Sequence, residues 1–306
     1  MKLKTIFVTE KNYLSLKLNN LIIKSENRET SIPLSDISVI MLDNPQIAIS
    51  ASLLSKIADS RITLFTCNDK HTPNGIYIPF NTHCRFSGIS RLQIELSEPF
   101  KKRCWQKIIK AKINNQFEVL KSKGLKNHVV LERLRDTVLS GDSSNLESQV
   151  ARIYFQSLFD NFVRVNKPNK IYADIRNIAL NYGYSIIRGA VARSIATSGL
   201  FPSIGVHHDN QFNAFNLADD LIEPFRAFVD IVVFDKYRTL SNFNIEFTKK
   251  DKADLLLILQ NKVVFNGKRE TILFTCGLAV QSYAKAVKNN KPDDLLFPSF
   301  LDDGRE

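Results

Sequence analysis

The sequence predicts an α+β protein, with a small, mostly-β N-terminal domain followed by a larger all-α domain. Before residue 85, short segments rich in Ile, Val, Phe, Tyr and Thr alternate with turn residues, as in strands. From Ser97 onward, apolar residues recur every three or four positions, as in amphipathic helices. The 306 residues suffice for two domains. We expect a β domain over 1–85, a linker over 86–96 and a helical domain over 97–306.

The β domain is expected to hold short strands and one helix. Leu18-Asn19-Asn20 predicts a hairpin turn between the second and third strands. A helix is expected over 50–59, where Leu53, Leu54 and Ile57 share one face. The expected strands are 5–8, 13–17, 21–24, 29–33, 37–42, 62–65 and 76–79.

The helical domain is expected to begin with a long helix over 97–122. Ser97 followed by Pro99 is a start signal, and Gly124 is a stop signal. Trp105 and Ile108 belong to its apolar face. The other expected helices are 129–139, 145–163, 174–197, 218–237, 252–260 and 269–288.

Charge favours a polyanionic partner. The net charge is +11 and the pI about 9.4, which favours nucleic acid. Between Arg91 and Arg135, twelve Lys and Arg face four Asp and Glu, an excess of eight positive charges. This excess fits either the solvated face of two helices or a surface that binds DNA phosphates.

Several classes of protein are disfavoured. The four cysteines form no CxxC pair, which argues against a zinc knuckle and a disulfide scaffold. No apolar run approaches the roughly 18 residues that span a bilayer, and no signal peptide is recognisable. We therefore expect a soluble cytoplasmic protein without a membrane partner. Nucleotide-binding glycine motifs and a Gly-x-Ser-x-Gly elbow are absent from the sequence.

Residues 205–226 concentrate the groups that could carry chemistry. Asp219, Asp220 and Glu223 stand three and four positions apart, so pairs of them can share one helix face. His207 and His208 lie in the loop before them, and imidazole with carboxylates suits Mg²⁺ or Mn²⁺. The alternative is an acidic helix start, favoured by the helix dipole.

The same stretch carries a resemblance to a known family. Ile204-Gly205-Val206-His207-His208, followed by Asp220-Leu221-Ile222-Glu223-Pro224-Phe225-Arg226, resembles the metal-binding signature of Cas1, the CRISPR-associated adaptation integrases. Residues 145–155, with Asn145 as the expected N-cap, resemble its first catalytic segment. Ala179-Leu180-Asn181-Tyr182-Gly183-Tyr184 with Arg188 resembles its core helix. Ile94-Glu95-Leu96-Ser97-Glu98-Pro99 and the His-His-Asp-Asn loop are similar to the type II branch.

The resemblance implies a site and a cofactor. The family's metal ligands and catalytic residues fall on Glu147, His208 and Glu223, which would bind Mg²⁺ or Mn²⁺. Many relatives carry Asp at the last of these positions, so Glu223 is a departure. Asp220 is either an outer ligand or a partner of Arg226.

The resemblance also implies an activity and partners. A metal-dependent DNA endonuclease and integrase of this family inserts short foreign fragments into a CRISPR array by 3′-hydroxyl transesterification, in prokaryotic antiviral defence. The implied partners are double-stranded DNA, a second copy paired through the β domains, a Cas2-like protein in a heterohexamer, and the Cas9 effector. A stand-alone metal-dependent nuclease, and a DNA-binding adaptor with a structural metal, are the alternatives.

Overall fold

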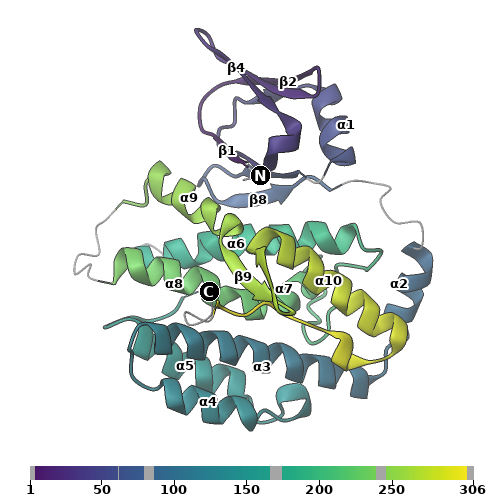
Figure 1. Cartoon of the computed structure of the whole chain (residues 1–306), viewed down its shortest axis with the longest axis vertical. Coiled ribbons are helices and arrows are strands. Elements are labelled where there is room, and N and C mark those ends of the chain that lie inside the picture. Colours follow the sequence, from purple (N-terminus) through teal and green to yellow (C-terminus); the bar gives the residue numbers. More distant parts are fainter. Residues whose placement is uncertain (1–3, 61, 79–85, 166–173, 239–245, 302–306) are drawn as a thin grey trace. The chain divides into compact units, whose positions relative to one another are not determined.

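The chain folds into two compact units, residues 1–82 and 83–306 (Figure 1). The computed structural model describes residues 4–60, 62–78, 86–165, 174–238 and 246–301. The first unit is rich in strands and the second is mostly helical, so the predicted α+β class and its order are confirmed. Among the described residues, no helix is both long and apolar enough to cross a membrane.

The N-terminal unit contains two four-stranded sheets and one helix. One sheet has the order β1-β5-β7-β8, with β8 antiparallel to β7 and the other pairs parallel. The second has the order β4-β3-β2-β6. The bounds are β1 Lys4–Val8, β2 Tyr13–Lys17, β3 Asn20–Lys24, β4 Glu29–Pro33, β5 Ile37–Leu42, β6 Ala48–Ile49, α1 Ala51–Asp59, β7 Thr63–Cys67 and β8 Pro73–Ile76.

Local signals placed most of these elements correctly. Leu18 and Asn19 both have positive φ, 48° and 60°, as a two-residue hairpin turn requires. Ser50 caps α1 by accepting from the Leu53 N–H. The strand expected over 76–79 is displaced toward the N-terminus. The observed strand β8 spans Pro73–Ile76 and ends where the expected strand begins. Residues 79–85 lie outside the described part of the chain.

The stretch expected to be a linker forms a helix instead. Residues 86–94 are α2 (Phe86–Ile94). Gln93 is fully buried and donates to the carbonyls of Phe201 and Ile204, while Ser90 donates to the Gly199 carbonyl. Because its buried polar groups bond to residues 199–204, α2 is part of the helical unit.

The helical unit is arranged around α3 (Glu98–Ser122), which packs against α4 and α5 (Figure 1). Ser97 caps it, with Pro99 in its first turn, and Gly124 beyond its end has φ 63°, as predicted. The unit is not entirely helical, because β9 (Lys262–Phe265) and β10 (Lys268–Thr271) form a hairpin before α10. The remaining helices are α4 His128–Asp136, α5 Leu146–Leu158, α6 Ile175–Ala196, α7 Asn216–Ile222, α8 Arg226–Tyr237, α9 Lys249–Leu256 and α10 Ile272–Asn289.

The helix predicted over 218–237 is broken at its centre. The 3₁₀ turn η4 (Glu223–Phe225) separates α7 from α8, with Pro224 in that turn. Proline has no N–H to donate to the preceding helical turn, so regular α-helix is disfavoured there. The break places Glu223 between two helices.

The close packing of two helices explains why the core-helix motif has a glycine at position 183. A Cβ atom on Gly183 in α6 would lie 2.4 Å from Val229 Cγ1 in α8, so these helices pack more closely than any side chain at this position allows. This close packing fixes α8, whose first residue is Arg226.

Candidate functional site

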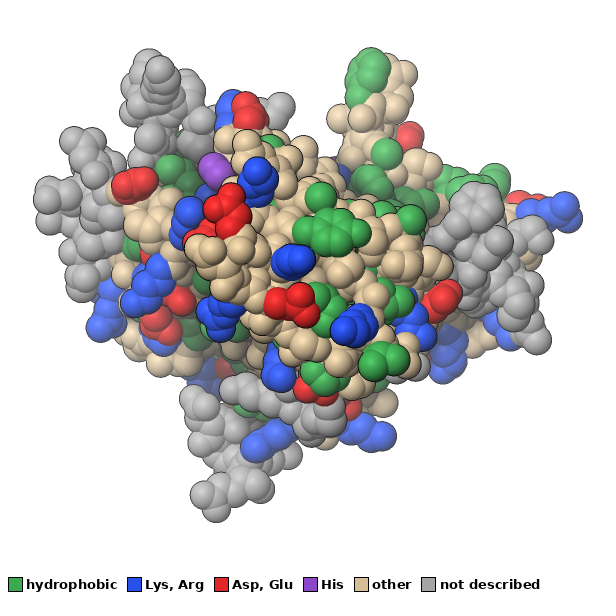
Figure 2. Space-filling model, turned by 90° about the horizontal axis from the view of Figure 1, so that it is seen from above, with side chains coloured by type: hydrophobic (Ala, Val, Ile, Leu, Met, Phe, Trp, Pro, Cys, Tyr) green, Lys and Arg blue, Asp and Glu red, His purple; other side chains and the backbone are tan. Residues whose placement is uncertain are grey.

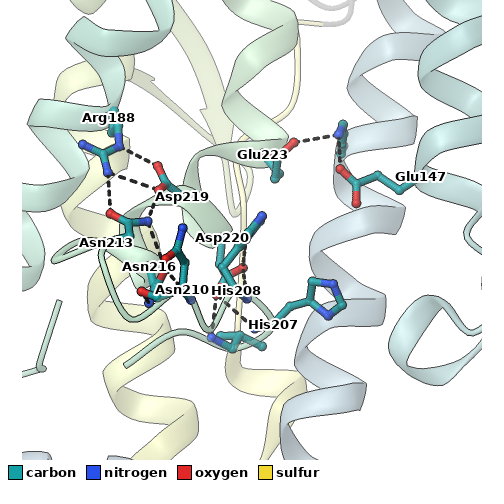
Figure 3. Close-up of polar contacts among 12 residues, drawn as sticks. Glu147, Arg188, His207, His208, Asn210, Asn213, Asn216, Asp219, Asp220 and Glu223 are labelled. Carbon is teal, nitrogen blue, oxygen red and sulfur yellow. Dashed lines mark hydrogen bonds and ion pairs between the residues drawn. The ribbon is translucent and has the colours of Figure 1, made fainter. Parts of the chain in front are cut away.

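The centre of the site is one ammonium group held between two carboxylates. Lys112 Nζ of α3 lies 2.6 Å from Glu147 Oε1 and 2.6 Å from Glu223 Oε2. Glu147 is in the first turn of α5 and Glu223 begins η4, and Figure 3 shows the two side chains pointing toward one another. Elements distant in sequence therefore direct two negative charges at one positive charge.

Glu223 is ionised although it is buried. Its side chain is 5% exposed. Burial alone would raise the pKa of this carboxyl, but Arg226 and Lys112 lower it to about 2. Arg226 donates from Nε to Glu223 Oε1 at 2.9 Å. Burial would likewise lower the pKa of Lys112, but the charges of Glu223 and Glu147 raise it, so the ammonium stays protonated.

The η4 turn is anchored by α3 as well. Asn115, one turn after Lys112, donates from Nδ2 to the Pro224 carbonyl at 2.7 Å and to the Pro298 carbonyl at 3.0 Å. Its side chain is buried, so these bonds are shielded from water. Asn115 thereby holds Glu223 beside Lys112.

Glu147 is positioned by a carboxylate that the sequence analysis did not identify. Asn145 occupies the N-cap position, but its side chain makes no capping bond and its φ is 51°. The cap is Asp142, whose two oxygens accept from the Leu146 and Glu147 N–H groups at 2.9 Å each. A carboxylate also suits the positive end of the helix dipole.

Asp220 organises the histidine loop. Its fully buried carboxylate accepts backbone N–H bonds from Val206, His207 and His208, at 2.5, 3.0 and 3.2 Å. A Cβ on Gly205 would lie 2.2 Å from the His208 carbonyl oxygen and 2.7 Å from Asp220 Oδ2. Only glycine therefore lets the loop wrap so closely around this carboxylate.

The same carboxylate orients His208. Nδ1 of the imidazole lies 2.6 Å from Asp220 Oδ1. An ionised carboxylate can only accept, so Nδ1 carries a proton and Nε2 of the neutral ring has a free lone pair. The hydrogen bond with Asp220 raises the pKa of His208, and the charge of Glu223 acts in the same direction. A histidine held this way is a common arrangement around bound metals.

His207 plays a different part. Its ring stacks on Trp105 of α3, with centroids 4.2 Å apart and planes 8° from parallel. Trp105 meets His208 edge-on at 5.9 Å. Trp105 and Lys112 are seven residues apart, two turns along one face of α3, so one helix face supports both the loop and the ammonium.

The side chain of Asp219 points away from both the histidine loop and Lys112. It accepts from Arg188 Nε at 2.5 Å and from Asn213 Nδ2 at 2.6 Å, within the polar cluster on the left of Figure 3. Despite their helical spacing, the carboxylates of Asp219, Asp220 and Glu223 thus serve three separate functions. Asp220 does not pair with Arg226, whose Nε bonds to Glu223.

The structure brings together two of the three predicted ligands. Glu147 and Glu223 meet at Lys112, whereas His208 is bonded to Asp220. Within the described residues, no three His, Cys, Asp or Glu side chains come close enough to share one metal ion. Glu223 Oε2 is nonetheless buried and makes no hydrogen bond besides its ion pair with Lys112. The partner of this buried oxygen among the described residues is a positive charge, as at a cation site.

Comparisons with known proteins agree with the sequence motifs. The family model described as CRISPR associated protein Cas1 matches residues 6–264. A CRISPR-associated endonuclease Cas1 from Neisseria meningitidis is 34% identical over 304 residues, covering 98% of this chain and 97% of the relative. The chain belongs to the Cas1 family. The Neisseria relative is consistent with the type II branch that the motifs indicate.

Solved structures share the fold of this Cas1 family member. A casposase bound to integration product aligns with TM-score 0.74 and 18% identity, covering 95% of this chain and 92% of the casposase. A chain of a partial Cas6-RT-Cas1–Cas2 complex aligns with TM-score 0.64 and 16% identity, covering 98% of this chain and all of that one.

Only some of the basic side chains between Arg91 and Arg135 are exposed at the surface of this Cas1 chain. Lys112 is buried in the site, Lys107 pairs with Asp293 and Lys123 pairs with Asp235. On the face drawn in Figure 2, basic side chains are interspersed with acidic ones. The exposed basic residues of the 91–135 region are Arg91, Lys102, Arg103, Lys121, Lys126 and Arg133.

Asp220→Ala is expected to destabilise the helical unit far more than Asp219→Ala. It would leave the buried Val206 N–H and the partly buried His207 and His208 N–H groups without their acceptor, at a cost of about 2–3 kcal/mol. Asp219 lies in a partly exposed ion pair worth ~1 kcal/mol or less. Urea unfolding followed by the fluorescence of Trp105, the chain's one tryptophan, measures both. Equal losses would contradict the role of Asp220 in organising the loop.

Proposed function

We propose that the chain is a metal-dependent DNA integrase that inserts short DNA fragments into a CRISPR array through attack by a 3′-hydroxyl on a phosphodiester. The observation that carries this proposal is the meeting of Glu147 and Glu223 at a single positive charge. Membership of the Cas1 family and the shared fold of a casposase bound to integration product support it.

The donor set suits a hard divalent cation. Glu147, Glu223 and the Nε2 atom of His208 would hold Mg²⁺ or Mn²⁺, which favour carboxylate oxygens and accept imidazole. Bound there, the ion would supply a Lewis acid that polarises a phosphoryl oxygen. In-line transfer between DNA strands needs no covalent intermediate on the protein, and the described residues that contact Glu147, His208 and Glu223 are not Ser or Cys.

The surrounding residues position the groups that act. Asp220 keeps the Nε2 lone pair of His208 free by holding Nδ1. Arg226 and Asn115 hold Glu223 from two sides, one at the carboxylate and one at the Pro224 carbonyl. Phosphoryl transfer depends chiefly on such positioning and on charge stabilisation, so this rigidity contributes directly to rate.

We further propose that DNA phosphates bind the exposed basic residues at the start of α3 and on α4. Lys102 and Arg103 are adjacent and exposed on α3, and Arg133 is exposed on α4. Such side chains follow a DNA backbone without reading its sequence. An integrase that accepts fragments of many sequences needs contacts of this kind.

The proposed protein partners are a second copy of the chain, a Cas2-like protein and the Cas9 effector. The fold shared with a chain of a Cas1–Cas2 complex supports the second partner, in a heterohexamer. The two sheets end at β1, β8, β4 and β6, and edge strands can pair across a dimer. The type II motifs support Cas9.

Glu147→Gln, Glu223→Gln and His208→Ala are each expected to lower strand transfer at least ~100-fold, because each removes a proposed ligand. The assay follows insertion of a labelled DNA duplex into a supercoiled plasmid carrying a repeat, with Mn²⁺ or Mg²⁺ present. Cutting without joining by the wild type would favour the stand-alone nuclease, and no turnover would favour the adaptor. Full strand transfer by any variant would remove that residue from the site.

Lys102→Glu with Arg103→Glu is expected to weaken DNA binding and to reduce the slope of log K against log salt concentration by about 2, one unit for each lost phosphate contact. Fluorescence anisotropy with a labelled duplex at several salt concentrations measures the slope. The control is Lys249→Glu with Lys250→Glu, a similarly exposed basic pair at the start of α9. Equal slopes in the two double variants would exclude this surface.

A further inference from the structure

Lys112 is an unusual residue to find at a cation site. Among the described residues, it is the one whose side chain forms ion pairs with both Glu147 and Glu223. Its side chain is 9% exposed. A lysine is costly to bury unless its charge is paired, so this position needs a specific partner set. The two carboxylates provide that set.

The ammonium lies where a bound ion would have to lie. Its nitrogen is 2.6 Å from one oxygen of each carboxylate. Mg²⁺ binds such oxygens at roughly 2.1 Å, so an ion bridging the same two atoms would fall in the same gap. The ion and the ammonium cannot both occupy it.

Charge balance leads to the same conclusion. Glu147 and Glu223 carry two negative charges, and Lys112 and Arg226 carry two positive charges, so these four groups are already neutral together. A divalent ion added to this group would meet a repulsive ammonium at close range in a partly buried site, where charges are weakly screened. Withdrawal of the ammonium removes that repulsion and frees both oxygens.

We propose that Lys112 is the built-in counter-cation of the metal site: it holds Glu147 and Glu223 together in the metal-free chain and leaves the gap when a divalent ion enters. This inference rests on the proposed metal dependence of the site. Metal affinity is then set by competition between the ion and Lys112, and the carboxylates stay positioned in the absence of metal.

The test is Mn²⁺ binding by the full chain without DNA, measured from the electron paramagnetic resonance signal of free Mn²⁺. Lys112→Met and Lys112→Gln are each expected to bind Mn²⁺ at least ~10-fold more tightly than the wild type, because a competing charge is removed. Both are expected to melt about 5 to 10 °C lower in EDTA and to recover when Mn²⁺ is added. Lys112→Arg, which keeps the charge, is expected to show no gain in affinity.

A matched control is available elsewhere in the chain. Lys236 also bridges two carboxylates, Asp251 at 2.7 Å and Asp254 at 2.6 Å. Lys236→Met is expected to lower the melting temperature without changing Mn²⁺ affinity.

The outcomes separate this inference from the proposed function. If the wild type binds Mn²⁺ and the neutral Lys112 variants bind it equally or more weakly, Lys112 is not a competitor and the inference is overturned, while the metal site stands. If Glu147→Gln and Glu223→Gln bind Mn²⁺ as well as the wild type, these residues form no metal site, and both proposals fail.

Discussion

A negative charge inside the protein is the constraint on which the site depends. Glu223 is almost fully shielded from water, and an unpaired carboxylate there would cost several kcal/mol or take up a proton. Lys112 and Arg226 keep it ionised, and each comes from a different helix. The packing of α3 and α8 beside η4 therefore follows from the need to neutralise this one group as well as from apolar burial.

The long helix α3 supplies most of what the site requires. Trp105 supports the histidine loop, Lys112 joins the two carboxylates, and Asn115 holds the backbone of η4. Behind the site, the ring of Tyr184 lies under Arg226, and its hydroxyl donates to the buried Asp230, whose pKa burial raises to about 6. Under the proposed function, a rigid shell of this kind would keep the reacting groups within the small tolerances that phosphoryl transfer demands.

Features with a local cause were predictable from sequence. The Leu18-Asn19 turn, the Ser97 cap and the Gly124 stop each depend on residues within a few positions, and all three occur as expected. The sequence predicts a linker over 86–96 because the partners that bind Gln93 to the helical unit lie more than 100 residues away.

The residues of the site show the same contrast between local signals and partners that are distant in sequence. Glu147, His208 and Glu223 could be named only through the Cas1 resemblance, because helical spacing made Asp219, Asp220 and Glu223 look equivalent. What distinguishes these carboxylates is tertiary: Arg188, the loop backbone and Lys112 are their respective partners. Lys112 belongs to the basic excess of this helix by composition, but it stands seven residues after Trp105 and four after Ile108, on the apolar face, and this spacing is the local signal that it points inward. Asn145 is the expected cap because of its position in the sequence, whereas the capping role of Asp142 depends on the backbone turn at residues 141–145.

The central claim is that Glu147 and Glu223 form one cation site that Lys112 fills in the absence of metal. The most direct measurement is a crystal structure of the Mn²⁺-soaked protein with an anomalous difference map. The account predicts a peak at roughly 2.1–2.3 Å from an oxygen of each carboxylate, with the Lys112 side chain moved out of the gap. A peak elsewhere, or an ammonium still lying between the two carboxylates beside a bound ion, would contradict it.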